Sequence, residues 1–181
     1  MDLPDLPHVV GVAERHLRPL GNRWLHTQAV AGRAAELSVT VDDADRPLLV
    51  AAAWWHDIGY GATQHDTGLH PLDGARWLAA QGYPPRLCAL VAHHSAATYE
   101  AEQRGLAREL AVWPNEQSAV TDALWTSDMT TGPAGQRYSY PQRLAEILNR
   151  YPPGSEVAAA MTAAQPTIEA ATARVTARLS R

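Results

Sequence analysis

The sequence contains no lysine, so all 15 of its basic residues are arginine. This absence excludes a P-loop lysine, a Schiff-base lysine and a Ser–Lys dyad. A phosphate group bound by this chain must therefore be held by arginine, by helix N-termini or by a metal ion. The formal net charge of −4 is also unfavourable for wrapping nucleic acid, because neutralising many phosphates requires a basic surface. We expect no nucleic-acid polymer among its partners.

Cysteine and long apolar segments are equally scarce. Cys88 is the single cysteine, which excludes a disulfide framework and any multi-cysteine zinc or iron–sulfur site. Charged or turn residues interrupt each apolar run, so we expect no membrane-spanning helix. Asp2 and Asp5 stand where an export signal would carry basic residues. We therefore expect a cytoplasmic protein that does not bind a membrane.

The length and the hydrophobic pattern predict one all-α domain spanning residues 1–181. Hydrophobic residues make up 46% and charged residues 19% of the 181 positions, which is typical of a compact globular domain. Apolar residues recur at helical spacing along most of the chain, and residues 37–41 are the only short candidate for a strand. The predicted helices cover residues 24–37, 48–57, 73–81, 86–95, 115–129, 141–151 and 166–179.

The segment AAAWWHDIGYG, residues 51–61, carries an adjacent histidine and aspartate at the end of an apolar helix. Leu49, Ala53 and His56 share one face of that helix, so the imidazole of His56 points toward the core. Asp57 follows where the helix ends. An imidazole suits Zn, Fe, Mn or Ni, and a carboxylate can bridge two ions. The pair is therefore a candidate for metal binding.

Four further candidate ligands lie on other helical segments, three of them near helix ends. His26 lies on the preceding helix, His70 opens the segment HPLDGARWLAAQG, His94 follows an apolar helix, and Asp128 ends the helix before a Gly/Pro-rich loop. Side chains at the ends of several helices can converge on one place. We expect these six residues to form one constellation.

His93 and His94 are adjacent, and the helical pattern ranks them. Leu87, Leu90 and His94 lie on one apolar face, whereas His93 lies on a flank. We therefore expect His94 to point inward as a ligand, with His93 as the alternate ligand or an outer contact. The acidic residue Asp73 lies where a helix begins and is expected to interact favourably with the helix dipole.

Taken in chain order, His26, the pair His56-Asp57 and Asp128 resemble the HD-domain superfamily of metal-dependent phosphohydrolases. The resemblance covers about residues 20–132 and implies an HD-domain helical bundle, with a C-terminal helical extension at about residues 140–181. The intermediate His70 and His94 make the chain similar to the branch that carries two metals.

The resemblance also implies how these residues divide between two divalent ions. His26, His56, Asp57 and Asp128 would hold the first ion, and Asp57 would bridge to a second ion held by His70 and His94. The ions could be Mn, Fe, Mg, Co, Ni or Zn. The sequence SAATYEAE follows His93 and His94 where cyclic-di-GMP phosphodiesterases carry a GYP-type signature, which argues against that subgroup.

The function expected from this pattern is hydrolysis of a phosphate mono- or diester of a small molecule, with nucleotides the commonest class by resemblance. Two cations bind a phosphoryl oxygen and lower the pKa of a bridging water, which generates hydroxide in place. We take Asp57, His56 and Arg23 as the candidate catalytic residues. The candidate substrate-binding residues are Arg23, Arg33, Thr130 and Thr131.

Two other functions are compatible with the same residues. Some superfamily members of similar ligand set use a mixed-valence di-iron centre to activate oxygen, and six His/Asp ligands suit iron equally well. The cluster could also be a non-catalytic metal or ligand-sensing site, although structural sites tend to be coordinatively closed. The C-terminal apolar stripe could pack within the chain, which we favour, or form a homodimer; it comprises Ile168, Ala171, Val175 and Leu179.

Overall fold

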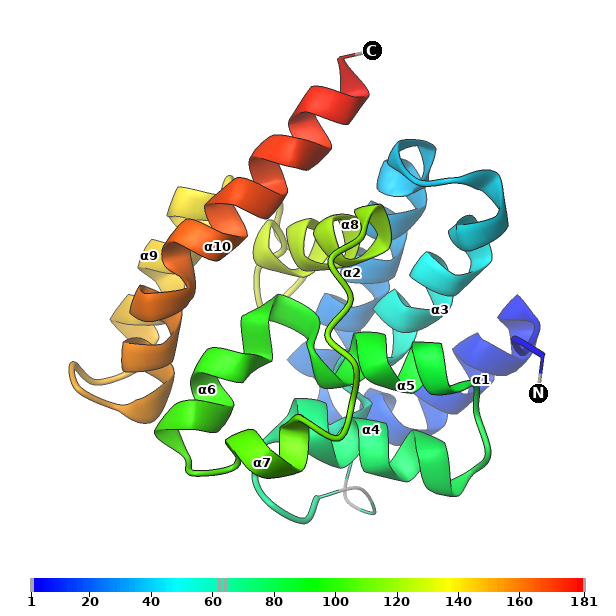
Figure 1. Cartoon of the computed structure of the whole chain (residues 1–181), viewed down its shortest axis with the longest axis horizontal. Coiled ribbons are helices and arrows are strands. Elements are labelled where there is room, and N and C mark those ends of the chain that lie inside the picture. Colours follow the sequence, from blue (N-terminus) through cyan, green and yellow to red (C-terminus); the bar gives the residue numbers. More distant parts are fainter. Residues whose placement is uncertain (1, 62, 64, 181) are drawn as a thin grey trace.

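A computed structural model describes residues 2–61, 63 and 65–180, and within these ranges the chain is mostly helical and forms no strand (Figure 1). The all-α prediction is thereby confirmed. The α-helices are α1 (Leu6–Leu17), α2 (Asn22–Leu37), α3 (Arg46–Trp55), α4 (His70–Ala80), α5 (Pro85–Ala92), α6 (Ala97–Gln103), α7 (Ala107–Leu110), α8 (Ala119–Met129), α9 (Tyr140–Arg150) and α10 (Glu156–Leu179).

Short polar side chains fix where several of these helices begin. Asp5, Ser118 and Ser155 each accept a hydrogen bond from a backbone N–H in the first turn of α1, α8 and α10. Ser139 and Gln142 form a reciprocal capping box at the start of α9. Such caps satisfy backbone N–H groups that have no partner within the helix.

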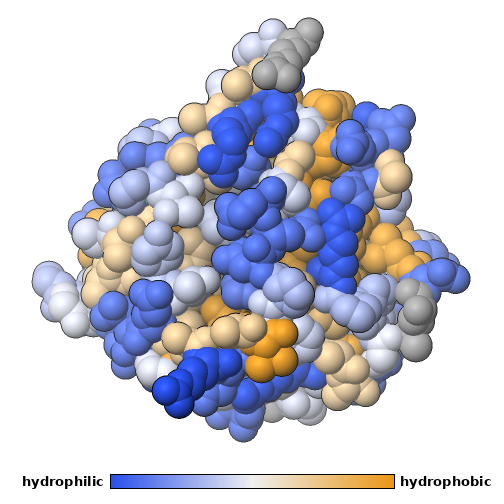
Figure 2. Space-filling view, in the orientation of Figure 1, coloured by the Kyte–Doolittle hydropathy of each residue, from blue (hydrophilic) through white to orange (hydrophobic). Residues whose placement is uncertain are grey.

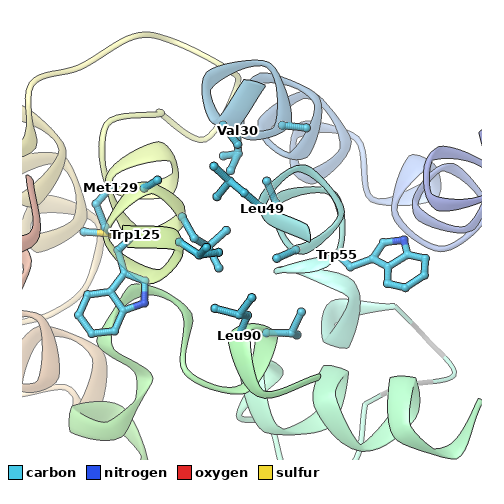
Figure 3. Packing of buried hydrophobic residues seen from close by; sticks show 14 of the residues in the cluster. Val30, Leu49, Trp55, Leu90, Trp125 and Met129 are labelled. Carbon is cyan, nitrogen blue, oxygen red and sulfur yellow. The ribbon is translucent and has the colours of Figure 1, made fainter. Parts of the chain in front are cut away.

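The core lies where α2, α3, α5 and α8 meet, and the central element is α3, which contacts all three of the others and α1. Figure 3 shows Val30, Leu49 and Leu90 directed into the space between these helices, and all three are buried. The indole N–H of Trp55 donates to the backbone carbonyl of Val9, 2.9 Å away, which ties α3 to α1. Because α3 ends in the interior, the residues that follow it are also buried.

The long helix α10 packs along α8 and α6, on the side of the molecule opposite α1 and α3 (Figure 1). Ile168, Ala171 and Val175 of the C-terminal stripe are buried within the chain. The buried carboxylate of Asp122 on α8 accepts hydrogen bonds from two arginines of α10, Arg174 and Arg178, at 2.6–2.9 Å. These contacts fix α10 against the centre of the fold.

The predicted start of the last helix at Pro166 is wrong, because α10 begins ten residues earlier and contains this proline in its interior. Proline is common in the first turn of a helix, which is why the sequence pattern placed the helix start there. In a helix interior it removes one backbone hydrogen bond and is disfavoured. Here Ala160 and Ala164 on the preceding turns are buried, so tertiary packing holds the helix through the proline.

Other boundaries also differ from the predicted ones. Residues 37–41 form the end of α2 and a 3₁₀ turn at Ser38–Thr40 rather than a strand. Helix α4 begins three residues before Asp73, because a proline at its second position suits a helix start. Helix α1 was not predicted, although Asp5 and a proline in its first turn mark its start.

An ion cluster on the surface joins α5 to the segment before α3 and to the segment before α8. The guanidinium of Arg86 pairs with Asp45 at 2.6 Å and with Glu116 at 2.8 Å, and we call these three residues the Arg86 ion cluster. Hydrogen bonds from Arg86 lower the pKa of Asp45, and they also lower that of Glu116 although its burial acts in the opposite direction. The cluster therefore stabilises the fold at neutral pH.

The surface mixes residue types, and the face drawn in Figure 2 has hydrophobic residues interspersed among hydrophilic ones. None of the helices in the described part of the chain is long and apolar enough to cross a membrane.

Candidate metal centre

The structure brings the six predicted ligand residues into one cluster. They come from three α-helices and from the turns that follow two others, and all except the half-buried His70 are buried. These residues are His26 on α2, His56 and Asp57 after α3, His70 at the start of α4, His94 after α5 and Asp128 near the end of α8. Their role as metal ligands remains a prediction.

The first of two groups within this cluster consists of His26, His56 and Asp128. The Nε2 atom of His26 lies 3.0 Å from Oδ1 of Asp128 and 3.4 Å from Nε2 of His56. One candidate ligand atom from each residue lies within 4.8 Å of the others, so the three could hold one ion.

The second group consists of Asp57, His70 and His94. Nε2 of His70 lies 3.2 Å from Oδ1 of Asp57 and 3.1 Å from Nε2 of His94. The other oxygen of the same carboxylate, Oδ2, lies 3.2 Å from Nε2 of His56 in the first group. The carboxylate of Asp57 therefore offers one oxygen to each group, as a bridging ligand would.

Backbone carbonyls determine which ring nitrogen of three histidines faces the cluster. The Nδ1 atoms of His26, His56 and His94 lie 2.7–3.0 Å from the carbonyl oxygens of Gly132, Ala53 and Val91. A carbonyl only accepts hydrogen bonds, so each Nδ1 carries the proton and Nε2 is the nitrogen left to bind a metal. Lone pairs that face one another at 3.1–3.4 Å repel unless a proton or a cation lies between them. The donor set therefore fits metal ions.

Burial and neighbouring charges shift the pKa values of these residues in different directions. Burial alone would lower the pKa of His56, but the nearby carboxylates, first that of Asp57, raise it to about 9. Burial and then the neighbouring imidazoles lower the pKa of His94 to about 3. Burial alone would raise the pKa of Asp57, yet Arg23 and His56 hold it well below its ordinary value. Asp57 is therefore a carboxylate at neutral pH.

A stack of three side chains forms one wall of the site. Nη1 of Arg23 lies 2.7 Å from Oδ2 of Asp57, and its guanidinium lies 4.0 Å from the centre of the Tyr60 ring. The Tyr60 ring also stacks on the imidazole ring of His70, and the centres of these two rings are 4.0 Å apart. Arg23 was predicted at the site from the sequence. Tyr60 was not, although its position three residues after Asp57 was an available signal.

Unusual backbone geometry occurs at two places beside the candidate ligands, at Gly59 near His70 and directly after His94. A Cβ atom at Gly59 would lie 2.0 Å from the carbonyl oxygen of His70, so only glycine allows this approach of the turn after α3 to α4. Ser95 and Ala96 both have positive φ, at 49° and 58°, directly after His94. The hydroxyl of Ser95 donates to Oδ2 of Asp128. Ser95 was not predicted from the sequence, because no local pattern places its hydroxyl beside α8.

The buried carboxylate of Asp73 organises the segment that leads to His70. Its two oxygens accept hydrogen bonds from the backbone N–H groups of Asp66, Thr67 and Gly68 and from the hydroxyl of Thr67, at 2.7–3.1 Å. Asp73 lies in the first turn of α4, as a helix-start acid does, but its side chain also holds the preceding loop. Asp73 is therefore a positioning residue for His70.

His93 lies outside both groups. Its Nε2 atom donates to the backbone carbonyl of Trp113, 2.9 Å away, and its Nδ1 atom lies 3.4 Å from the hydroxyl of Thr98. Burial lowers the pKa of His93. Of the two adjacent histidines, His94 is the one that joins the cluster.

Three predicted substrate-binding residues do not line the cleft beside the cluster. Arg33 pairs with Glu36 on the same helix at 2.7 Å. The hydroxyls of Thr130 and Thr131 each donate to the backbone carbonyl four residues earlier in α8. These hydroxyl groups satisfy the end of the helix, and the entrance roles of the two threonines stay predictions.

The cluster opens into a cleft with a volume of about 240 Å³. Asp57, His70, His94 and Asp128 line it, together with Arg23 and Tyr60 of the stack. A small molecule that enters the cleft therefore reaches both groups of ligands.

The family model for the HD domain matches residues 23–124, which is more than half of the chain. The chain belongs to the HD domain family. The resemblance that the sequence predicted is thus confirmed, and five of the six clustered residues lie within the match, with Asp128 just beyond it. No curated protein and no solved structure matches the chain.

Membership of the HD domain family agrees with the helical fold and with the His/Asp cluster of this chain. HD domains are helical, bind divalent metals and belong generally to a superfamily of metal-dependent phosphohydrolases. The residues that this chain places at its centre are of the types that such metals require.

Proposed function

We propose that this HD domain is a hydrolase that cleaves a phosphate mono- or diester of a small molecule with the help of two divalent ions. The observation that carries the proposal is the carboxylate of Asp57, which offers one oxygen to each group of histidines at the floor of an open cleft. A structural metal site tends to be coordinatively closed, with protein ligands at every position. An open site between two donor groups suits a substrate.

In this proposal the six clustered residues act as ligands of the two ions. His26, His56 and Asp128 would hold one ion, and His70 and His94 would hold the other, with Asp57 shared. When bound, two divalent ions supply a polarised water at neutral pH and stabilise the charge that develops on a phosphoryl oxygen. The backbone carbonyls behind three of the imidazoles keep these rings in the required orientation.

Arg23 is the candidate for orienting the phosphate group. Its guanidinium lines the cleft, and contacts with Asp57 and Tyr60 hold it in place. Guanidinium groups bind phosphate oxygens in a planar, two-point geometry. In a chain without lysine, Arg23 would provide the cation nearest to the reacting phosphate.

The proposal is tested by elemental analysis of the purified protein and a phosphate-release screen over nucleotides and sugar phosphates. Asp57→Ala should lower turnover by about 10³-fold or more, because both ions would lose a ligand. Asp42→Ala removes an exposed acid and is the matched control, with activity expected to stay within twofold of the parent. A folded Asp57→Ala variant with unchanged phosphate release would refute the mechanism.

The same donor set favours one alternative, a di-iron oxygenase, because imidazole and carboxylate ligands suit iron as well as the ions of hydrolases. The two functions separate in one pair of measurements. Iron in the untreated protein together with substrate-dependent oxygen uptake would identify the oxygenase, whereas phosphate release without oxygen uptake would identify the hydrolase.

A further inference from the structure

One wall of the cleft comes from α9 and α10, which lie outside the matched residues 23–124. Ile147 on α9 and Met161 on α10 contribute apolar surface, and Tyr151 follows the end of α9. Arg143 and Arg150 of α9 line the same wall. The cleft therefore has a metal-ligand floor and a wall that combines apolar and cationic groups.

Arg143 is the unusual residue in this wall, because only 5% of its surface is exposed. One of its terminal nitrogens, Nη1, pairs with Glu146 one turn along α9. Its Nε atom is buried and has no hydrogen-bond partner among the described residues. A buried guanidinium with an unused donor is energetically unfavourable unless another group completes its hydrogen bonds.

The charge balance of this wall is positive. Arg143 and Arg150 share one acid, Glu146, and the second pairing is long, at 3.5 Å. Arg104, which lines the same cleft, instead has two acids of its own, Glu100 at 2.8 Å and one on α10 at 3.3 Å. The excess cation therefore belongs to α9 and not to the cleft as a whole.

We infer that Arg143 and Arg150 form a second anion-binding subsite, so that the ligand of this cleft carries two anionic groups joined by a short apolar linker. One group would be the phosphate ester at the metal ligands, and this part of the inference depends on the proposed function. The other, a phosphate or carboxylate, would bind the two arginines, and the linker would lie against Ile147 and Met161. Charge-assisted hydrogen bonds to arginine are strong and geometrically selective.

The hydrolysis test compares three esters of similar length: butyl phosphate, 4-(phosphooxy)butanoate and butane-1,4-diol bisphosphate. We expect kcat/KM for at least one doubly anionic ester to exceed that for butyl phosphate by about tenfold or more, as a hydrogen-bonded charge pair allows. The carboxylate and the bisphosphate arms distinguish which second group is preferred. Arg143→Gln should remove this preference while leaving butyl phosphate within twofold.

Two further variants make the result specific. Arg150→Gln changes an exposed side chain, so it should fold normally and reduce the same preference in part. Arg18→Gln removes an exposed arginine that also pairs with a glutamate four residues earlier, and it should change nothing. Equal rates for singly and doubly anionic esters in the parent protein would overturn the subsite. An equal loss for all esters in a folded Arg143→Gln variant would also overturn it.

A binding measurement separates the subsite from the hydrolysis. Calorimetric titration of the full-length protein with butylphosphonate and butane-1,4-diphosphonate, which are not hydrolysed, should show about tenfold tighter binding of the diphosphonate. Arg143→Gln should abolish that difference. If no ester is cleaved but the difference persists and depends on Arg143, the proposed function fails and the subsite stands. Equal affinity for both phosphonates would overturn the subsite whether or not hydrolysis occurs.

Discussion

The hydrogen bonds of Asp73 provide a sharp test of how the fold positions His70. Replacing Asp73 by asparagine keeps the size and shape of the side chain but turns one acceptor oxygen into an NH₂ donor. In the folded protein Oδ1 accepts from the N–H and hydroxyl of Thr67, and Oδ2 accepts from three backbone N–H groups. The N–H of Thr67 lies within reach of both oxygens, so replacing Oδ2 leaves the N–H groups of Asp66 and Gly68 without this acceptor, whereas replacing Oδ1 leaves only the hydroxyl of Thr67 without it.

The structure sets the size of the effect. A hydrogen bond to a charged group contributes about 1.5–3 kcal/mol, so the loss of one or two gives about 1.5–6 kcal/mol. The loop that carries Thr67 lies near the surface, and water can satisfy part of what is lost, so we expect a decrease of about 1–4 kcal/mol in the free energy of unfolding. A domain typically has 5–15 kcal/mol of stability, so the variant should still be folded at 25 °C.

Urea unfolding followed by circular dichroism measures this decrease directly. Asp66→Asn is the matched control, because it changes an exposed acid of the same loop that pairs with Arg76 at the surface, and it should cost less than about 1 kcal/mol. Because His70 follows the loop, Asp73→Asn should also weaken binding of the ion that we propose at Asp57, His70 and His94 more than binding of the ion that we propose at His26, His56 and Asp128. A variant within about 0.5 kcal/mol of the parent, with the same metal content as the parent, would refute the positioning role of Asp73.

Three further predictions follow from other parts of the fold. Gly59→Ala should lower the free energy of unfolding by about 1–3 kcal/mol, because its Cβ would lie 2.0 Å from the His70 carbonyl; Gly11→Ala, which meets no atom within 4 Å, is the control. Asp122→Ala should lower it by about 1–2 kcal/mol and make α10 more sensitive to proteolysis, since two arginines of α10 lose their shared acid. In the Arg86 ion cluster the carboxylate pKa values are lowered by folding, so its stabilisation exists above about pH 4 and is lost as the pH falls through the folded-state values. Arg86→Gln should therefore cost under about 1 kcal/mol at pH 7, and urea titrations should show this difference shrink as the pH falls through the lowered pKa values of the two carboxyl groups.

The ligand cluster was accessible from the sequence because its members have local signatures. His56 and His94 each follow an apolar helix and share its buried face, so the direction of their side chains follows from helical geometry alone. The order of the histidines and aspartates then resembled one family, whose model matches residues 23–124. Local pattern and family resemblance together predicted all six clustered residues.

The rest of the site depends on contacts between distant segments that no local pattern encodes. The wall formed by Arg143 exists because α9 and α10 return across the cleft, and α9 lies outside the family match. Thr130 and Thr131 were expected at the entrance from their nearness to Asp128, but a threonine at a helix end can satisfy the helix's own carbonyls. The short separation from Asp128 in the sequence predicts that Thr130 and Thr131 lie near the site, but it does not predict the direction of their side chains.

The carbonyl groups at the ends of α3 and α5 orient two of the candidate ligands, His56 and His94. The last carbonyls of a helix lack an intrahelical partner, and His56 and His94 each donate Nδ1–H to such a carbonyl three residues earlier, at Ala53 and Val91. One hydrogen bond thus satisfies the helix end, selects the tautomer and turns Nε2 toward the cluster. His26 lies within α2, where carbonyls are already used, and its Nδ1–H instead donates to a carbonyl 106 residues away in sequence. Two of the three orientations are therefore set locally as each helix forms, and the third is set only when the segment after α8 packs against α2.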